Sequence, residues 1–330
     1  MSFRLIPVIA LALAAGAGWC ETAKKAEFAY TGEPIVLPAK CTNEVMESVG
    51  LFCPADSPCP VYLQLSSVEF IGGKLYVAGN LHTEAVTIAS VLLASEDGGL
   101  TWREAADRVP RATLDRVVFF DEKHGWAAGH VLEGGRPHDP FFLITTDGGQ
   151  FWRRRPVFEK PRAAVIEDFW FDSDHSGILL VEARSEEGTG TEYERFETMT
   201  GAESWMVREV SSRPIRVRRR PAPRRQDWRI ETDEARDAWA VRKRTDTGWV
   251  TAAEFAIGAG ACVRQEEKAV AEAEAEAGKA PETAAAGQAV QAPAEDKGVF
   301  VIGAPPPSVA QPAEKPARDE KPPTLKKPRS

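Results

Sequence analysis

Short apolar runs recur along the chain, and clusters of turn-forming residues separate them. Residues 68–79, 118–129 and 169–180 can be aligned, because each begins with an apolar run, continues through a polar turn of Gly or Asp and ends in a second apolar run. Runs of this length and order predict strand, turn and strand. Their recurrence at about fifty residues predicts one supersecondary unit used repeatedly. We therefore expect an all-β fold.

A second motif follows each of these units. Residues 95–102 read Ser-Glu-Asp-Gly-Gly-Leu-Thr-Trp, and residues 145–152 read Thr-Thr-Asp-Gly-Gly-Gln-Phe-Trp. Asp-Gly-Gly supplies positive-φ residues for a tight hairpin and a carboxylate that accepts turn amide protons. The first hydroxyl joins the same turn, while the final Trp packs under the next sheet. A worn third copy spans 198–205, with Thr200 in place of the Asp. The predicted turn residues are Ser95, Asp97, Gly98, Gly99, Thr101, Trp102, Thr145, Asp147, Gly148, Gly149, Trp152, Gly201 and Trp205.

These turns resemble the Asp-box, or BNR, repeat, whose pattern Ser-x-Asp-Gly-Gly-x-Thr-Trp is matched in full by residues 95–102. The second copy departs by Thr145 for Ser and Phe151 for Thr. Gly-Trp-Ala-x-Gly at 125–129 is similar to the photosystem II stability and assembly factor family of propellers, a resemblance that covers residues 62–212. It implies a β-propeller with Asp-box hairpins. The photosystem role does not transfer, because the matching residues maintain the fold.

The repeats organise the chain into domains. We expect about four propeller blades over residues 62–262, divided as 62–110, 111–160, 161–212 and 226–262, the last without an Asp-box. Four blades lie at the low end of the usual range of about four to eight. A small closed ring, an open arc and an assembly completed by another copy all fit, and we favour the small ring.

The two ends of the chain differ from the repeats. Residues 1–17 carry Arg4, an apolar run and a small-residue cleavage site, which predicts a signal peptide and export to the periplasm, envelope or extracellular space. The apolar run is too short for a standard membrane-spanning helix. Residues 18–61 form an N-terminal segment. Residues 263–330 are rich in Ala, Glu, Pro and Lys, so we expect a disordered tail.

Cysteine usage fits an oxidising compartment. Cys41, Cys53, Cys59 and Cys262 form an even set, for which three connectivities exist. The short loop between Cys53 and Cys59 suggests a local bridge, which leaves Cys41 for Cys262. A zinc site is the rival interpretation, but its usual pair of cysteines two residues apart is absent.

Positive charge is concentrated between the third and fourth repeats, although the net charge of the chain is −8. Clustered guanidinium groups suit phosphates, carboxylates and acidic polymers, so this segment is the candidate interaction surface. A merely solvated connection is the alternative. The candidate residues are Arg213, Arg216, Arg218, Arg219, Arg220, Arg224 and Arg225.

Enzymatic chemistry is not visible in the sequence. Sialidases also carry Asp-boxes, but the resemblance requires an arginine triad and a Tyr nucleophile with a Glu partner. Only Tyr193 has acidic neighbours, Glu192 and Glu194. Residues 172–177 imitate the start of a calcium loop, yet Ala183 occupies its twelfth position, so a hairpin is the simpler interpretation. We therefore predict no catalytic, cofactor-binding or metal-binding residue.

The sequence thus favours an exported, non-enzymatic propeller that serves as a binding or assembly scaffold in the cell envelope. The expected partner is an envelope protein or an anionic polymer, not a nucleic acid, and oligomers are compatible with the repeats. The alternative is a carbohydrate-binding protein or a divergent sialidase-like glycoside hydrolase. Paired carboxylates and exposed aromatic residues in a central channel would favour that alternative.

Overall fold

The computed structural model describes residues 27–184, 190–217 and 227–265. The chain divides into two compact units, Met1–Glu272 and Ala273–Ser330, and all described residues belong to the first. The predicted signal peptide and nearly all of the predicted tail lie outside the described residues.

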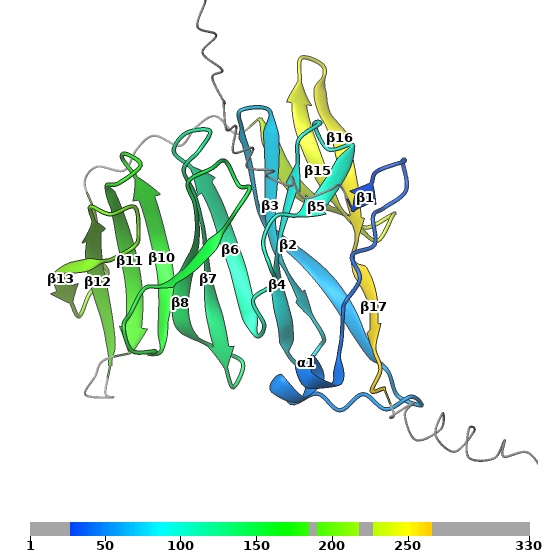
Figure 1. Ribbon diagram of the computed structural model, residues 1–330, viewed down its shortest axis with the longest axis horizontal. Helices are drawn as coiled ribbons and strands as arrows, with labels where there is room; N and C mark the ends of the chain where they lie inside the picture. Colours follow the sequence, from blue (N-terminus) through cyan, green and yellow to red (C-terminus); the bar gives the residue numbers. More distant parts are fainter. Residues whose placement is uncertain (1–26, 185–189, 218–226, 266–330) are drawn as a thin grey trace, which may run out of the picture. The chain divides into compact units, whose positions relative to one another are not determined.

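The regular secondary structure of the described residues is almost entirely β-strand, and the strand pairings are antiparallel (Figure 1). In the described part of the chain there is one helix, α1 (Asn43–Ser48), capped by Thr42, whose side chain accepts a hydrogen bond from the Val45 amide. The first sheet has six strands in the order β1 (Phe28–Ala29), β5 (Thr101–Glu104), β4 (Thr87–Ser95), β3 (Lys74–His82), β2 (Cys59–Ile71) and β17 (Gly258–Cys262).

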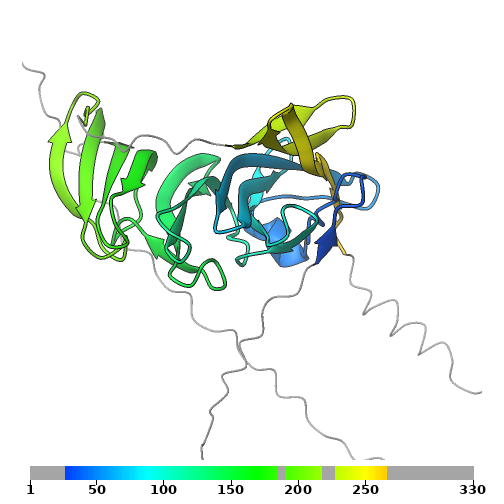
Figure 2. The ribbon, with the colours of Figure 1, turned by 90° about the horizontal axis from the view of Figure 1, so that it is seen from above.

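Three further sheets follow the first along the chain, and each keeps its strands in sequence order (Figures 1 and 2). The second sheet contains β6 (Ala112–Phe119), β7 (Gly125–Glu133), β8 (Arg136–Thr145) and β9 (Arg153–Pro156). The third contains β10 (Ala164–Phe171), β11 (Gly177–Arg184), β12 (Thr191–Thr198) and β13 (Met206–Ser211). The fourth contains β14 (Trp228–Asp233), β15 (Ala238–Thr245) and β16 (Gly248–Ala256).

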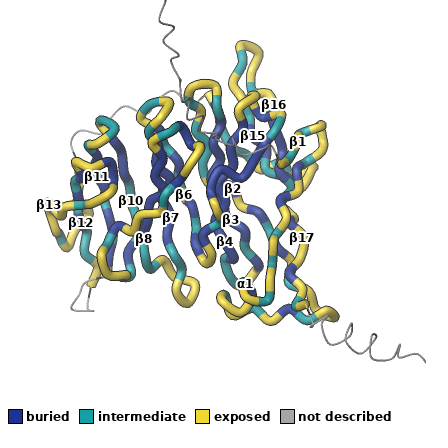
Figure 3. The backbone as a smooth tube through the Cα atoms, viewed as in Figure 1, coloured by how far each residue is buried: buried dark blue, intermediate teal, exposed yellow. Residues whose placement is uncertain are grey.

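The core lies between sheets, so the central strands are buried on both faces (Figure 3). Successive residues of a strand point to opposite faces. Accordingly, Val77 joins a core shared with the fourth sheet, while Tyr76 and Ala78 join a core shared with the second. Trp126 and Ala128 of the second sheet belong to a third core, shared with the third sheet. Both faces of these strands are therefore apolar, which explains their long apolar runs.

The sheets pack side by side in the order fourth, first, second and third. Each Trp that ends a turn motif packs against the sheet before its own in that order. Trp152 of the second sheet contacts Tyr76 of the first, with ring centroids 6.1 Å apart. Trp205, which follows the third turn, lies 5.5 Å from Phe142 of the second sheet, and Trp102 lies 5.1 Å from Phe255 of the fourth. The sequence predicted a neighbouring sheet but assigned the wrong side, because sequence order alone does not give the direction of packing.

The fourth repeat is divided between two sheets. Its last strand, β17, pairs with β2 of the first sheet rather than with β16. Among the residues that the structure describes, no cluster of buried hydrophobic residues joins the third sheet to the fourth. A closed ring of four sheets, which the sequence favoured, would require such a cluster.

Two disulfides connect the N-terminal segment to this region, in the pairing that the sequence suggested. Cys53 is bonded to Cys59, and Cys41 is bonded to Cys262. Cys262 also lies opposite Cys59 in the pairing of β17 with β2. Within the described part of the chain, no helix has the length and apolar character needed to cross a membrane.

Candidate functional site

The two Asp-Gly-Gly turns are closed by their own side chains. Asp97 accepts hydrogen bonds from the amides of Leu100 and Thr101 at 3.1 and 2.9 Å, and from the Thr101 hydroxyl at 2.6 Å. Burial raises the pKa of Asp97, but the hydrogen bonds from Thr101, Ser95 and Leu100 outweigh it and lower the pKa below its usual value. Asp147 accepts the equivalent amide protons, from Gln150 and Phe151. These carboxylates are fully engaged in turn structure.

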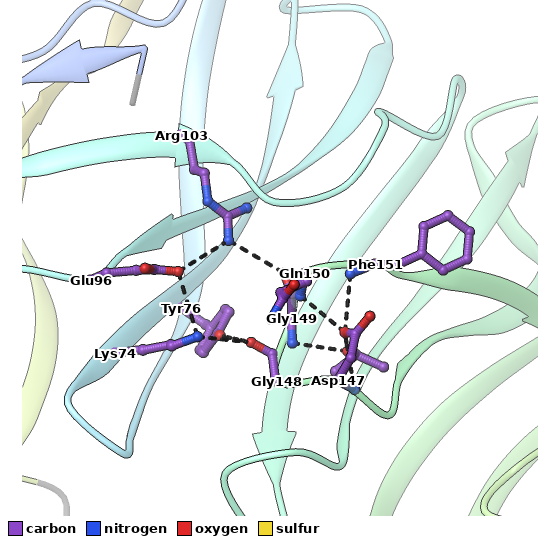
Figure 4. Close-up of polar contacts among 10 residues, drawn as sticks. Lys74, Tyr76, Glu96, Arg103, Asp147, Gly148, Gly149, Gln150 and Phe151 are labelled. Atoms are coloured by element: carbon purple, nitrogen blue, oxygen red, sulfur yellow. Dashed lines mark hydrogen bonds and ion pairs between the residues drawn. The ribbon is translucent and has the colours of Figure 1, made fainter. Parts of the chain in front are cut away.

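Side chains at the same end of the molecule connect neighbouring sheets (Figure 4). The buried Tyr76 hydroxyl donates to the carbonyl of Gly148 at 2.6 Å, and Arg103 donates to the carbonyl of Gly149 at 3.4 Å. Arg103 and Lys74 both lie 3.5 Å from the carboxylate of Glu96. Burial raises the pKa of Tyr76 to about 12. A tyrosine in this state is a hydrogen-bond donor and not a nucleophile.

A different set of polar residues gathers at β-bulges in the first strands of three sheets. The register of β2 against β3 shifts at Ser66, that of β6 against β7 at Asp115, and that of β10 against β11 at Glu167. A bulge leaves one residue unpaired and redirects its side chain, and bulges are common next to active sites. These bulges could not be predicted from the sequence, because they depend on the strand register.

In the first two sheets, the polar residue that lies across the strand pairing from the bulge accepts a hydrogen bond from a backbone amide of the next sheet. Asn80 accepts a hydrogen bond from the Leu114 amide at 2.7 Å, and the Nε2 atom of His130 accepts one from the Ile166 amide at 2.7 Å. The Nδ1 atom of His130 donates to Asp115 at 2.8 Å, so both nitrogens of this buried imidazole are used. His130 therefore has a structural role.

Glu182 occupies the equivalent position in the third sheet. It follows Val181, which pairs with the residue before the bulge, as Gly79 and Gly129 do in the first two sheets. Its described contact is with Glu167, the bulge residue of its own sheet. In the third sheet this position therefore carries a carboxyl group, which contacts the carboxyl group of the bulge residue.

The Glu167–Glu182 pair has the electrostatics of a proton-carrying site. Partial burial raises the pKa of Glu167, and the charge of Glu182, its hydrogen bond and the charge of Asp168 raise it further. Two carboxylates in contact cannot both ionise easily, so the pair retains a proton to higher pH than a lone Glu. Perturbed carboxyl pairs of this kind are candidate acid–base groups.

Three further groups surround the pair. Asp168 accepts a hydrogen bond from Arg116 of β6 at 2.7 Å, and Arg116 also lies over the ring of Phe169, 5.0 Å from its centroid. Tyr193 lies directly opposite Glu182 in the pairing of β11 with β12, so their side chains share a face of the sheet. A proton donor, a second carboxylate and an aromatic ring are therefore close together on the third sheet.

The sequence showed Glu192 and Glu194 only as the acidic neighbours of Tyr193. Glu194, its neighbour in sequence, points to the opposite face, where it is buried and pairs with Arg162. The acid that shares the face of Tyr193 is Glu182, eleven positions earlier in the chain. Strand alternation separates adjacent residues and cross-strand pairing joins distant ones. The available signal was the alternating pattern of β12, combined with the alignment of the repeats.

The candidate arginine surface is described only in part. Arg213 and Arg216 are exposed, and the remaining members, Arg218, Arg219, Arg220, Arg224 and Arg225, lie outside the described residues. Among the described residues, no group of three or more His, Cys, Asp or Glu side chains is arranged to hold a metal ion.

Comparisons with known proteins give no sequence relatives. No protein-family model matches the chain, and no curated protein matches it either. Solved structures do match. A polysaccharide lyase, an ulvan lyase of a new family, has 10% identity and a TM-score of 0.36, over 63% of this chain and 54% of its own. Its complex with a -[GlcA(1-4)Rha3S]- ligand matches with 11% identity and a TM-score of 0.35, over 61% of this chain and 52% of its own.

A sialidase is also similar. The sialidase of Trypanosoma rangeli, in complex with sialic acid, has 11% identity and a TM-score of 0.27, over 62% of this chain and 41% of its own. The chain spans about half the length of the lyase structures that it matches.

The matched structures named above are those of enzymes, contrary to the expectation of a non-enzymatic scaffold. The expectation of a non-enzymatic protein rested on a search for known sets of catalytic residues. A complete sialidase set is absent from the sequence, and the carboxyl pair that the fold assembles comes from residues 167 and 182, on two strands.

Proposed function

We propose that the chain is an exported, carbohydrate-active enzyme of propeller-type architecture, with repeated Asp-box hairpins as its structural turns. The proposal rests on one observation, the hydrogen-bonded pair of Glu167 and Glu182 with a raised Glu167 pKa. Two disulfides support export, because disulfides persist in oxidising compartments.

The pair would supply the proton for cleavage of a glycosidic bond. Enzymes that hydrolyse such bonds use one carboxyl group as an acid and a second carboxylate on the other side of the bond. Hydrogen-bonded acids lie closer together than the roughly 5 Å that separates these two roles, so Glu167 and Glu182 act as one unit. The one proton that the pair shares passes to the leaving oxygen, which leaves both carboxyl groups ionised until solvent reprotonates the pair.

The remaining groups fit the other parts of such a reaction. Asp168, held by Arg116, is the candidate second carboxylate that takes a proton from the attacking water. Tyr193 offers an aromatic ring next to Glu182, and sugar rings pack well on aromatic faces through their C–H groups. The sequence alternative required paired carboxylates and exposed aromatic residues in a central channel, and the carboxyl pair is the part of that requirement that supports the proposal.

The test is an activity assay with the full chain on a panel of neutral and acidic polysaccharides. Products are quantified by new reducing ends and by the ultraviolet absorbance of unsaturated sugars, so hydrolysis and elimination are distinguished. We expect Glu167→Gln and Glu182→Gln to lower the rate by about 10²–10⁴, the usual contribution of an acid–base group.

The matched control is Glu209→Gln, because Glu209 is in the same sheet and pairs with Arg195, away from the acid pair. It should retain the wild-type rate. An inactive wild-type chain on the whole panel, or a fully active Glu167→Gln variant, would exclude this proposal.

A further inference from the structure

A pocket of about 200 Å³ lies where the turns of the second and third sheets meet. His124 and His175, from corresponding turns of the two sheets, line it together with Asp174, Arg153, Glu203 and Thr200. The acid pair lies elsewhere, since Glu167 is four residues from the end of β10, a distance of about 13 Å along a strand. The pocket is therefore a separate site.

Each histidine is fixed by a carboxylate of its own turn. The Nδ1 atom of His124 lies 3.0 Å from both oxygens of Asp121, and that of His175 lies 2.7 Å from Asp174. Hydrogen bonds from His124 and Lys123 lower the pKa of Asp121 to about 2 against the opposing effect of burial, so this group is an acceptor. The Nδ1 atoms thus carry the protons.

The Nε2 atoms are left for a ligand. Within the described ranges, neither His124 nor His175 has a hydrogen-bond partner at Nε2. With the proton on Nδ1, a neutral imidazole accepts a hydrogen bond at Nε2 and a protonated one donates there, and a hydroxyl group can bind either form. Two imidazoles from different sheets, each with Nε2 able to bind a hydroxyl group, therefore line one pocket.

The charges of the pocket do not favour an anion. Glu203 pairs with Arg153 and with Arg155, the latter at 2.6 Å, and Asp174 adds a second carboxylate to the wall. Acceptors from Asp174, Glu203 and the imidazoles alternate with donors from Arg153 and Thr200. Hydroxyl groups both donate and accept, so a polyhydroxylated, uncharged ligand satisfies such a lining better than a sulfate or a carboxylate.

The lining of the pocket also includes apolar residues. Trp126 and Ile144 contribute to its lining, and Trp126 is fixed by donating to the carbonyl of Gly201 at 2.9 Å. The volume lies below the roughly 300–1,000 Å³ of pockets for drug-sized ligands, so one ring-sized unit fits. A pyranose has hydroxyl groups at its rim and C–H groups on its faces, which suit a lining that contains both polar and apolar residues.

We propose that this pocket binds one uncharged pyranose unit of a glycan. It is a binding subsite that operates independently of Glu167 and Glu182, so it holds whether or not the acid pair is catalytic.

The experiment follows the ring signals of the five histidines by NMR while methyl glycosides of glucose, galactose, mannose, xylose and rhamnose are added. We expect at least one glycoside to shift the His124 and His175 signals saturably, with a Kd on the order of 1 mM. His82, His130 and His138 serve as internal controls and should not move. Glucuronate, sulfate and Zn²⁺ are titrated separately.

The matched variants are Asp174→Asn and Asp172→Asn, two changes of the same chemistry in one turn. Asp174 lines the pocket and Asp172 does not. We expect Asp174→Asn to weaken binding about tenfold or more, through loss of charged hydrogen bonds, and Asp172→Asn to leave it unchanged. An unchanged His130 spectrum reports that each variant is folded.

Three outcomes would overturn the proposal. They are no saturable shift with any neutral glycoside, a response only to glucuronate, sulfate or Zn²⁺, and equal binding by Asp174→Asn and the wild type. Titration of Glu167→Gln separates this site from the acid pair: retained binding supports an independent subsite, and lost binding excludes one.

Discussion

The hydroxyl of Tyr76 donates a hydrogen bond to the carbonyl of Gly148 across the boundary between the first and second sheets, at 2.6 Å. Trp126 makes the corresponding contact one sheet later, from its indole nitrogen to the carbonyl of Gly201 at 2.9 Å. Both acceptors belong to positive-φ glycines, at which a Cβ atom would lie 2.7 Å from a backbone oxygen. The turns thus bind one neighbouring sheet while they close their own.

Replacing Tyr76 with Phe should destabilise the protein by about 1–3 kcal/mol, because a buried carbonyl loses its strongest donor. The free energy of unfolding is measured by urea denaturation. Tyr62→Phe is the matched control, since no described hydrogen bond involves the Tyr62 hydroxyl, and its effect should stay within about 0.5 kcal/mol. Equal effects of the two changes would contradict the role of this hydroxyl.

The same tyrosine should make stability fall at alkaline pH. Burial raises its pKa from 10.0 to about 12, so the folded state holds the proton more tightly than the unfolded state. This contribution is fully present below pH 10 and is lost as the pH rises toward 12, and it amounts to about 2–3 kcal/mol. The stability gap between the wild type and Tyr76→Phe should therefore narrow above pH 10 in urea titrations. A constant gap would mean that Tyr76 titrates normally.

The turns could be predicted from the sequence because each is a local arrangement. Asp97 and its donors lie within six residues, and their spacing alone determines the hydrogen bonds. Repetition also predicted the all-β character, and the loop between Cys53 and Cys59 suggested the short disulfide.

The candidate site could not be predicted in the same way. Glu167 and Glu182 meet only because β10 carries a bulge and pairs with β11 in a particular register. Whether Asn80, His130 or Glu182 binds a following sheet depends on the order in which the sheets pack. That order is a tertiary property, and the placement of β17 in the first sheet illustrates it.

Asp97→Ala should destabilise the first turn by about 1–3 kcal/mol, because two amides and two hydroxyls lose their acceptor. The pKa of Asp97 is lowered from 3.8, so its stabilising effect is present above pH 3.8 and is lost as the pH falls through the folded-state value. Urea denaturation at pH 7 and near pH 3 measures both effects. We expect the difference between wild type and variant to shrink in acid, and a difference that grows would contradict the assignment.

The third turn allows the opposite test, in which a carboxylate acceptor is added to a turn that lacks it. Thr200 occupies the position of the Asp, and its hydroxyl accepts a turn amide from Ser204 at 3.0 Å. Thr200→Asp adds a second acceptor oxygen and should stabilise the protein by about 0.5–1.5 kcal/mol, the net value of one hydrogen bond. Thermal unfolding checks this, with Thr247→Asp, in an exposed turn of the fourth sheet, as the control. A lower Tm for Thr200→Asp alone would mean that repulsion from Glu203 outweighs the added bonds.

The two disulfides should differ in their contribution to stability, because they close loops of very different length. Cys41 and Cys262 are 221 residues apart, whereas Cys53 and Cys59 are 6 apart. In the chain-entropy account, removing the long bridge by Cys→Ser changes costs about 5 kcal/mol, and removing the short one costs about 2 kcal/mol. Urea denaturation of the two double variants measures both values, and β17 should lose hydrogen-exchange protection first in the variant without the long bridge. If both variants lose the same stability, the constraint on the unfolded chain is not the source, and local strand pairing near Cys59 and Cys262 accounts for the effect instead.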